Sequence, residues 1–129
     1  MTAIRNLLSG ESMVLEPQMP IEQAVVVMRQ KGITSAVVLN EDDTVAGILA
    51  ESDIIKMFID PCNGGIEGAS VEDFMTRDVI TEQVDSDIDK ISRILLNHHF
   101  RQIPVVCGGK FVGIITKKDL IKYMVELNG

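Results

Sequence analysis

A threonine and an aspartate three residues apart, Thr116 and Asp119, are the side chains of this 129-residue chain whose spacing most directly suggests chemistry. A carboxylate can accept hydrogen bonds from two neighbouring hydroxyl groups, and charge-assisted hydrogen bonds are the stronger kind. A threonine followed by an acid at this spacing is also close to a capping box at the start of a helix. The pair therefore predicts either a binding group or a helix start.

The stretch that contains this pair occurs twice. "GIITKKDL" (113–120) resembles "GILAESDI" (47–54), which begins 66 residues earlier. Asp53 keeps the aspartate, but Ala50 replaces the threonine and has no hydroxyl group. Ser52 could cap this helix in place of Ala50, with a shifted helix start.

The repeat extends upstream, where residues 20–39 align with residues 87–106 at an offset of 67. Both segments place apolar residues at i, i+3 and i+7, the pattern of a helix with one buried face. We expect these stripes to pack in the core. They consist of Ile21, Ala24 and Met28 in the first copy and Ile88, Ile91 and Leu95 in the second.

Each of these helices is followed by a β-branched run, a turn ("NEDD" or "CGGK") and a second apolar run, which predicts a β-hairpin. A closing helix comes next, and a short extended piece such as residues 79–81 comes before the unit. One such unit has too little core to be stable alone, so two are expected to pack together. The predicted strands and closing helices are 35–39, 44–49 and 51–59 in the first copy and 103–106, 110–115 and 117–127 in the second.

The chain is predicted to contain a first repeat with an N-terminal helix (1–59), a linker (60–70) and a second repeat (71–129). The linker is rich in turn-forming residues. Ser70 and Asp73 have the spacing of a helix start.

Composition narrows the class of protein. With 46% hydrophobic and 24% charged residues, the chain reads as a globular protein without a membrane span or a secretory signal. The net charge of −7 argues against nucleic-acid binding, which needs a basic surface. Cys62 and Cys107 could form a disulfide, but free thiols in a reducing, cytoplasmic setting are the favoured interpretation.

The ordered set of phrases resembles a tandem pair of cystathionine-β-synthase (CBS) domains, often called a Bateman module. The phrases are "PIEQAVVVM", "GITSAVVL" and "VAGILAESDI" in the first repeat and "VEDFMTRDVIT", "RQIPVV" and "FVGIITKKDL" in the second. The resemblance covers about residues 12–123 and leaves no further catalytic domain. It implies an α/β (α+β) fold of two repeats, each a small sheet with packed helices, related by pseudo-two-fold symmetry.

The resemblance also implies a function. CBS pairs typically bind AMP, ADP, ATP or S-adenosylmethionine in clefts between the repeats, often in energy sensing, and commonly form homodimers. The expected protein is a regulatory module that needs no cofactor beyond this ligand and signals to a separate protein partner. The alternative is a dimerisation or interaction module without a physiological nucleotide.

In the family pattern Gly-h-h-Thr-x-x-Asp, where h is apolar, the aspartate binds the ribose hydroxyls and the threonine supports ribose or phosphate. The pattern falls on Gly113, Thr116 and Asp119. In the first repeat Asp53 fits it, but Ala50 departs from it, which weakens the expectation for that site.

The other candidate ligand-binding residues each have an ordinary alternative. Lys118, and less so Lys117, would contact phosphate at a helix N-terminus, or would be solvated lysines. Arg101 would bind phosphate, or would be a rim arginine. Thr34 and Ser35, the matching positions in the first repeat, offer hydrogen bonds without charge. By the same resemblance the candidates also include Ile80, Thr81, Ile103, Pro104 and Ala36.

The sequence lacks the residue sets that would predict catalysis or metal binding. We find no nucleophile, base and orienting group in combination, so no catalytic residue is assigned and an enzyme is disfavoured. His98 and His99 are adjacent and lack the ligand spacing of a metal site.

Charge differs between the two copies. Residues 12–57 contain three basic and seven acidic residues, net −4, whereas residues 79–124 contain seven basic and five acidic residues, net +2. Glu51 stands in the first copy where Lys117 stands in the second. We therefore expect two unequal sites, with phosphorylated ligand favoured at the second copy.

Overall fold

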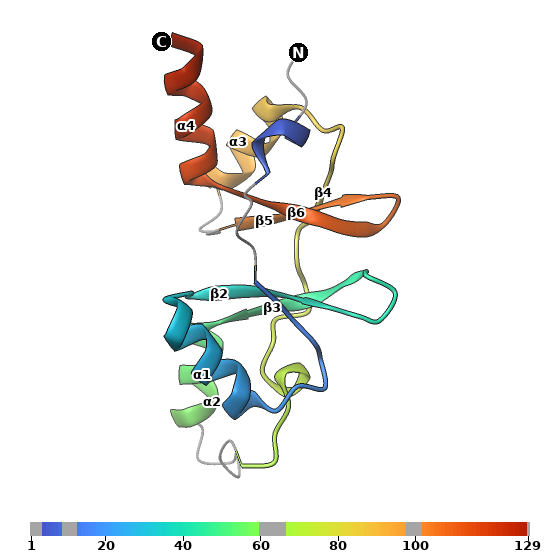
Figure 1. The fold of residues 1–129 in the computed structure, drawn as a ribbon, viewed down its shortest axis with the longest axis vertical. Coiled ribbons are helices and arrows are strands. Elements are labelled where there is room, and N and C mark those ends of the chain that lie inside the picture. The colour runs from blue at the N-terminus through green and yellow to red at the C-terminus, as the bar shows by residue number, and fades with distance from the viewer. Residues whose placement is uncertain (1–3, 9–12, 60–66, 98–101, 129) are drawn as a thin grey trace. The chain divides into compact units, whose positions relative to one another are not determined.

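The computed structural model describes residues 4–8, 13–59, 67–97 and 102–128 of the chain. Within these residues, four α-helices and two small three-stranded sheets form an α+β fold (Figure 1). The elements in chain order are η1 (Ile4–Leu7), β1 (Val14–Leu15), α1 (Ile21–Lys31), β2 (Ser35–Leu39), β3 (Val45–Ala50), α2 (Glu51–Ile59), η2 (Val71–Asp73), β4 (Glu82–Gln83), α3 (Ile88–Asn97), β5 (Gln102–Cys107), β6 (Lys110–Thr116) and α4 (Lys117–Asn128), where η marks a 3₁₀ helix.

The chain divides into two compact units that interleave in sequence. The first-repeat unit spans Met13–Val79, and the second-repeat unit joins the N-terminal segment that carries η1 to the residues from Ile80 onward. In the second-repeat unit η1 contacts α4. In the first-repeat unit Val71 of η2 is buried in the core. Each unit thus takes its 3₁₀ helix from the segment that precedes the other repeat.

Both sheets have the same topology. The two predicted hairpins form, β2 with β3 and β5 with β6. A two-residue strand then adds to each hairpin in parallel, β1 beside β2 and β4 beside β5. In the second copy this strand is Glu82–Gln83, just after the segment 79–81 that the sequence predicts to be extended.

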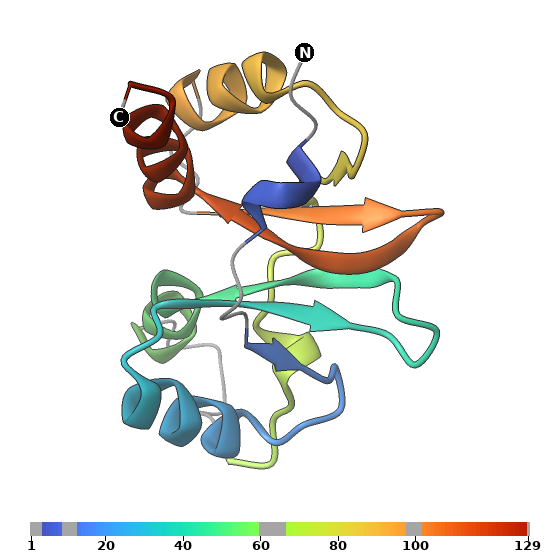
Figure 2. The same ribbon diagram turned by 45° about the horizontal axis from the view of Figure 1, so that its top comes forward.

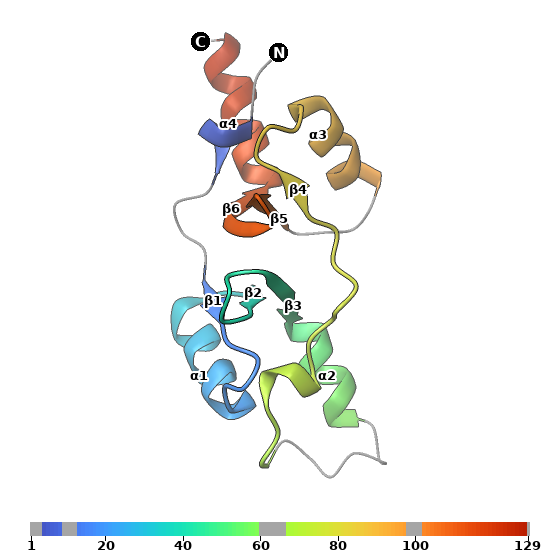
Figure 3. The same cartoon turned by 90° about the vertical axis from the view of Figure 1, so that its right-hand side faces the viewer.

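In each unit the helices cover one face of the sheet, as the turned views show (Figures 2 and 3). The predicted helical stripes pack against these sheets because their apolar residues repeat at the helical period. Five of the six stripe residues are buried, and Ile88 is partly buried against the core of the second-repeat unit. The buried five are Ile21, Ala24, Met28, Ile91 and Leu95.

At one core position the repeats differ in polarity. Leu15 is fully buried in the first-repeat unit, whereas the residue 67 positions later is the buried Glu82. Its carboxylate accepts a hydrogen bond from Ser86 Oγ at 3.1 Å. It also forms an ion pair with Lys90 Nζ at 3.2 Å, so the buried charge is compensated.

The thiol of Cys107 is free and exposed, whereas Cys62 lies outside the described residues. None of the helices described in the structure has both the length and the apolar composition needed to cross a bilayer.

Candidate functional site

Thr116 and Asp119 form a capping box at the start of α4. The backbone N–H of Thr116 donates to Asp119 Oδ2 at 2.8 Å, and the Thr116 hydroxyl donates to the same oxygen at 2.9 Å. In return the N–H of Asp119 donates to Thr116 Oγ1 at 3.3 Å. The helix-start interpretation of this pair is therefore confirmed.

Capping leaves part of the Asp119 carboxylate available. Both bonds that the carboxylate accepts end on Oδ2, and Oδ1 has no hydrogen-bond partner among the residues described in the structure. The side chain is only half-buried. The helix-start role of Asp119 is thus compatible with the binding role that the resemblance implies, because the two would use different oxygen atoms.

Strand β5 places two further candidates, Ile103 and Pro104, near this helix start. Gln102 pairs with Thr116, and Ile103 pairs with the preceding Ile115. Ile103 is fully buried in the core of its unit, and Pro104 is buried as well. Any contact from Ile103 to a ligand would therefore have to use its backbone.

The remaining candidates of the second-repeat unit are either exposed or outside the residues that the structure describes. Lys117 and Lys118 are exposed in the first turn of α4. Ile80 and Thr81 are exposed and lead into β4, which pairs with β5. Arg101 lies outside the described residues.

The corresponding carboxylate of the first-repeat unit is bound differently. Asp53 Oδ2 accepts the backbone N–H of Ala50 at 2.9 Å. Asp53 Oδ1 accepts the hydroxyl of Thr76 at 3.0 Å. Helix α2 begins at Glu51, so Ser52 lies inside the helix and the shifted helix start does not occur.

Thr76 is a hydrogen-bond partner of this candidate residue that the sequence did not reveal, because it is 23 residues from Asp53. It is held by the edge of β3, where it exchanges two backbone hydrogen bonds of 2.9 Å with Ile48. A Cβ atom on Gly47 would lie 2.5 Å from the Thr76 carbonyl oxygen. Glycine at position 47 therefore permits the close approach of Thr76. The residue that aligns with Thr76 in the other repeat is Ser9, which lies outside the described residues.

The other first-repeat candidates also lie beside the start of α2. The carbonyl oxygen of Thr34 accepts the N–H of Glu51 at 3.1 Å. Ser35 pairs with Ala50 across the hairpin. Thr34 and Ser35 are half-buried, whereas Ala36 is buried in the core.

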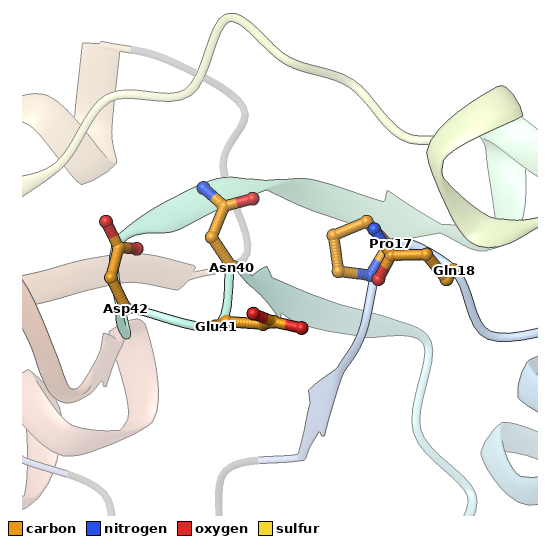
Figure 4. Close-up of a pocket in the computed structure, with 5 residues that line it drawn as sticks. All are labelled: Pro17, Gln18, Asn40, Glu41 and Asp42. Carbon is orange, nitrogen blue, oxygen red and sulfur yellow. The ribbon is translucent and has the colours of Figure 1, made fainter.

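A pocket of about 390 Å³ lies elsewhere in the first-repeat unit (Figure 4). It sits at the turn of the β2–β3 hairpin, the opposite end of these strands from Asp53, and it contains none of the candidate residues. Its lining residues are Pro17, Gln18, Asn40, Glu41 and Asp42. Among the described residues, no three His, Cys, Asp or Glu side chains cluster in a way that could hold a metal ion.

The sequence model of the CBS domain matches the chain twice, over residues 4–60 and 71–126. MJ1225, an uncharacterized protein of Methanocaldococcus jannaschii, is 27% identical over 121 residues, which cover 94% of this chain and 42% of that protein. The chain therefore spans less than half the length of this relative.

Solved structures share the fold. An uncharacterized conserved protein from Pyrococcus horikoshii is 29% identical with a TM-score of 0.77, over 95% of this chain and 92% of that chain. CBSX2 of Arabidopsis thaliana, in its complex with AMP, is 20% identical with a TM-score of 0.86 over the whole of both chains. At 20% identity this likeness concerns the fold alone.

Proposed function

Because the chain belongs to the CBS domain family and carries two copies of the domain, we propose that it is a regulatory module that senses an adenosine-containing nucleotide. The observation that carries the proposal is the carboxylate of Asp119, which caps α4 with one oxygen and presents the other without a partner among the described residues. The AMP complex of CBSX2, which has the same fold, supports this class of ligand.

In this proposal the ribose of the ligand binds at Asp119. Its two cis-hydroxyls donate to the carboxylate, and charge-assisted bonds of this kind are strong. Phosphate groups then lie near the first turn of α4, where backbone N–H groups favour anions and Lys118 adds positive charge. Arg101, Ile80, Thr81 and the strand residues Ile103 and Pro104 complete the proposed site. AMP, ADP, ATP and S-adenosylmethionine all contain the required ribose.

Regulation requires that the ligand bind one conformation of the module more tightly than another, since a ligand shifts an equilibrium only by its differential affinity. We propose that the shift is transmitted to a separate protein partner. The ligand acts as an effector and is returned unchanged, so chromatography after long incubation with the protein should recover intact nucleotide.

We also propose that the module forms a homodimer. Helix α4 exposes Ile121, Met124 and Val125, and α2 exposes apolar residues at the three equivalent positions, 66 residues earlier. Apolar stripes of this kind mark interaction surfaces. The stripe of α2 consists of Ile55, Phe58 and Ile59.

The same exposed stripes support a second candidate, an interaction module without a physiological nucleotide. The first-repeat unit favours this alternative, since Ala50 lacks the hydroxyl of the family pattern. Both candidates place the chain in the cytoplasm, without a nucleic-acid or membrane partner, in keeping with its net charge of −7 and the free thiol of Cys107.

A thermal-shift panel distinguishes the two candidates. A nucleotide present at 100 times its Kd should stabilise the protein by about 2.7 kcal/mol, which raises Tm by several degrees for a chain of this size. AMP, ADP, ATP and S-adenosylmethionine are each tested, and mass spectrometry identifies small molecules that remain bound through native purification. If none of the four changes Tm, the interaction module is the better description.

A further inference from the structure

Asp53 and Asp119, the aspartates at the family-pattern positions, differ in which of their carboxylate oxygens accept hydrogen bonds from the protein. From this difference we infer that the Thr76 hydroxyl competes with the two ribose hydroxyls of a ligand for the carboxylate of Asp53. Asp119 is then the nucleotide-binding carboxylate of each chain. The inference rests on the proposed function and adds a residue that determines how many nucleotides one chain binds.

The argument begins with the acceptor positions of a carboxylate, which has two on each oxygen. At Asp119 the protein fills both positions of Oδ2 and, among the residues that the structure describes, neither position of Oδ1. At Asp53 it fills one position of each oxygen, through Ala50 N–H and the Thr76 hydroxyl. Two cis-hydroxyls can both donate to an oxygen that is entirely open. Among the described residues Asp119 has such an oxygen, whereas each oxygen of Asp53 keeps one open position beside a donor that the protein already supplies.

The backbone of Thr76 is fixed beside Asp53, although its side chain is exposed. Its backbone N–H and carbonyl are both bonded to Ile48 at 2.9 Å, and the absence of a side chain at Gly47 lets its carbonyl lie against β3. A β-branched side chain also has few χ1 rotamers. A ribose hydroxyl that takes the place of Thr76 on Oδ1 would therefore have to break the bond between Thr76 and Asp53 and turn the exposed threonine hydroxyl toward water.

The missing hydroxyl at Ala50 is part of this difference between the two carboxylates. In the second repeat the Thr116 hydroxyl donates to Oδ2, the oxygen that the capping N–H already uses, and none of the described residues donates to Oδ1. Ala50 has no hydroxyl. The hydroxyl that donates to Asp53 belongs instead to Thr76, and it donates to Oδ1, the oxygen that the capping N–H does not use. The two units thus direct a threonine hydroxyl to opposite oxygens of equivalent carboxylates.

The test uses calorimetric titration with AMP in the Asp119→Ala background, where residual binding reports the first-repeat unit. Adding Thr76→Val removes the hydroxyl, keeps the side-chain shape and should tighten this residual binding about three- to tenfold, the range expected for one hydrogen bond. A further Asp53→Ala substitution should abolish the gain. In the wild-type background AMP should bind once per chain.

Thr44→Val is the matched control. The hydroxyl of Thr44 also donates to an aspartate of the same unit, Asp42, at 2.6 Å, but at the turn of the hairpin. It should leave AMP binding unchanged in the Asp119→Ala background. An equal gain from both valine substitutions, or two equivalent binding events per wild-type chain with one lost on Asp53→Ala, would overturn the inference.

A ligand-free measurement separates this inference from the proposed function. In a double-mutant cycle of Thr76→Val and Asp53→Ala, the shifts in urea midpoint should be clearly non-additive, because each substitution removes the same bond. Additive shifts would overturn the inference whether or not AMP binds. Coupling without binding of any adenosine compound to any variant would instead overturn the proposed function, and with it the assignment of Asp119.

Discussion

Thr116 and Asp119 form three hydrogen bonds with each other, and the two that reach the carboxylate both end on Oδ2. The pair is therefore a helix start in which one carboxylate oxygen receives no hydrogen bond from the part of the chain that the structure describes. A capping role and a binding role predict different responses to mutation, so they can be measured separately.

Replacing Thr116 tests the capping role. Thr116→Ala should lower the free energy of unfolding by about 1 kcal/mol, because alanine at an N-cap cannot accept the N3 N–H. Thr116→Ser keeps the hydroxyl and should recover most of this loss. Urea unfolding of the ligand-free protein provides the measurement. Equal stability of the alanine and serine variants would show that the hydroxyl does not support α4.

Replacing Asp119 tests both roles together. Asp119→Ala should weaken the binding of AMP or ATP about tenfold or more, since a hydrogen bond to a charged group contributes roughly 1.5–3 kcal/mol. It should also lower the ligand-free Tm, because the capping box loses its N3 acid. Calorimetry and thermal unfolding report the two effects. Wild-type affinity with a lower Tm would mean that Asp119 is a helix-start residue only.

The parts of the fold that depend on local pattern could be predicted from the sequence. The helical stripes follow from a residue period of about 3.6, and both hairpins follow from two apolar, β-branched runs on either side of turn residues. The capping box of Thr116 and Asp119 spans three residues, so its spacing is visible as well. The interleaving of the units was not predictable in this way, because η1 joins α4 through packing across most of the chain.

Thr76 shows the same limit at the candidate site. Its hydroxyl reaches Asp53 only because its backbone bridges to Ile48. The sequence contains one trace of this contact, the glycine at position 47. Gly47 and Gly113 are equivalent positions of a repeated phrase. The phrase does not indicate which residues each glycine contacts.

The two glycines should respond differently to alanine. Gly47→Ala places a Cβ 2.5 Å from the Thr76 carbonyl oxygen, a backbone atom, and should lower the free energy of unfolding by about 1–3 kcal/mol. Gly113→Ala places a Cβ 3.2 Å from the Leu8 side chain, which can move, so its loss should be smaller. Urea titrations of both variants measure the difference. A larger loss from Gly113→Ala would contradict the close backbone contact at Gly47.

The exposed apolar stripes predict where the homodimer forms. Phe58, on α2, is 79% exposed and Met124, on α4, is 59% exposed. Phe58→Glu and Met124→Glu should each shift the protein toward monomer, because a charge in a dimer interface opposes burial. Sedimentation velocity at micromolar concentration provides the measurement.

Val26→Glu is the control for the dimer. Val26 is an exposed apolar residue on α1, 52% accessible, outside the two stripes. This variant should remain dimeric. A wild-type protein that sediments only as a monomer would count against the proposed homodimer, as would equal dissociation by all three substitutions.

The last prediction concerns salt. The residues beside the two aspartates differ in charge, Glu51 and Ser52 in the first copy against Lys117 and Lys118 in the second. A cation attracts phosphate, and this attraction weakens as salt screens it. Binding of ATP at Asp119 should therefore be the tighter and more salt-sensitive event, lost in Asp119→Ala and largely kept in Asp53→Ala.

Titrations of ATP at low and high salt decide this comparison. Lys118→Met should reduce the salt dependence while AMP and ATP still bind, because the ribose contact with Asp119 is kept. If Asp53→Ala instead removes the tighter, more salt-sensitive event, then Ala50 is no handicap. In that case Arg101 and the backbone would supply the charge recognition, and the proposed site would have to move to the first repeat.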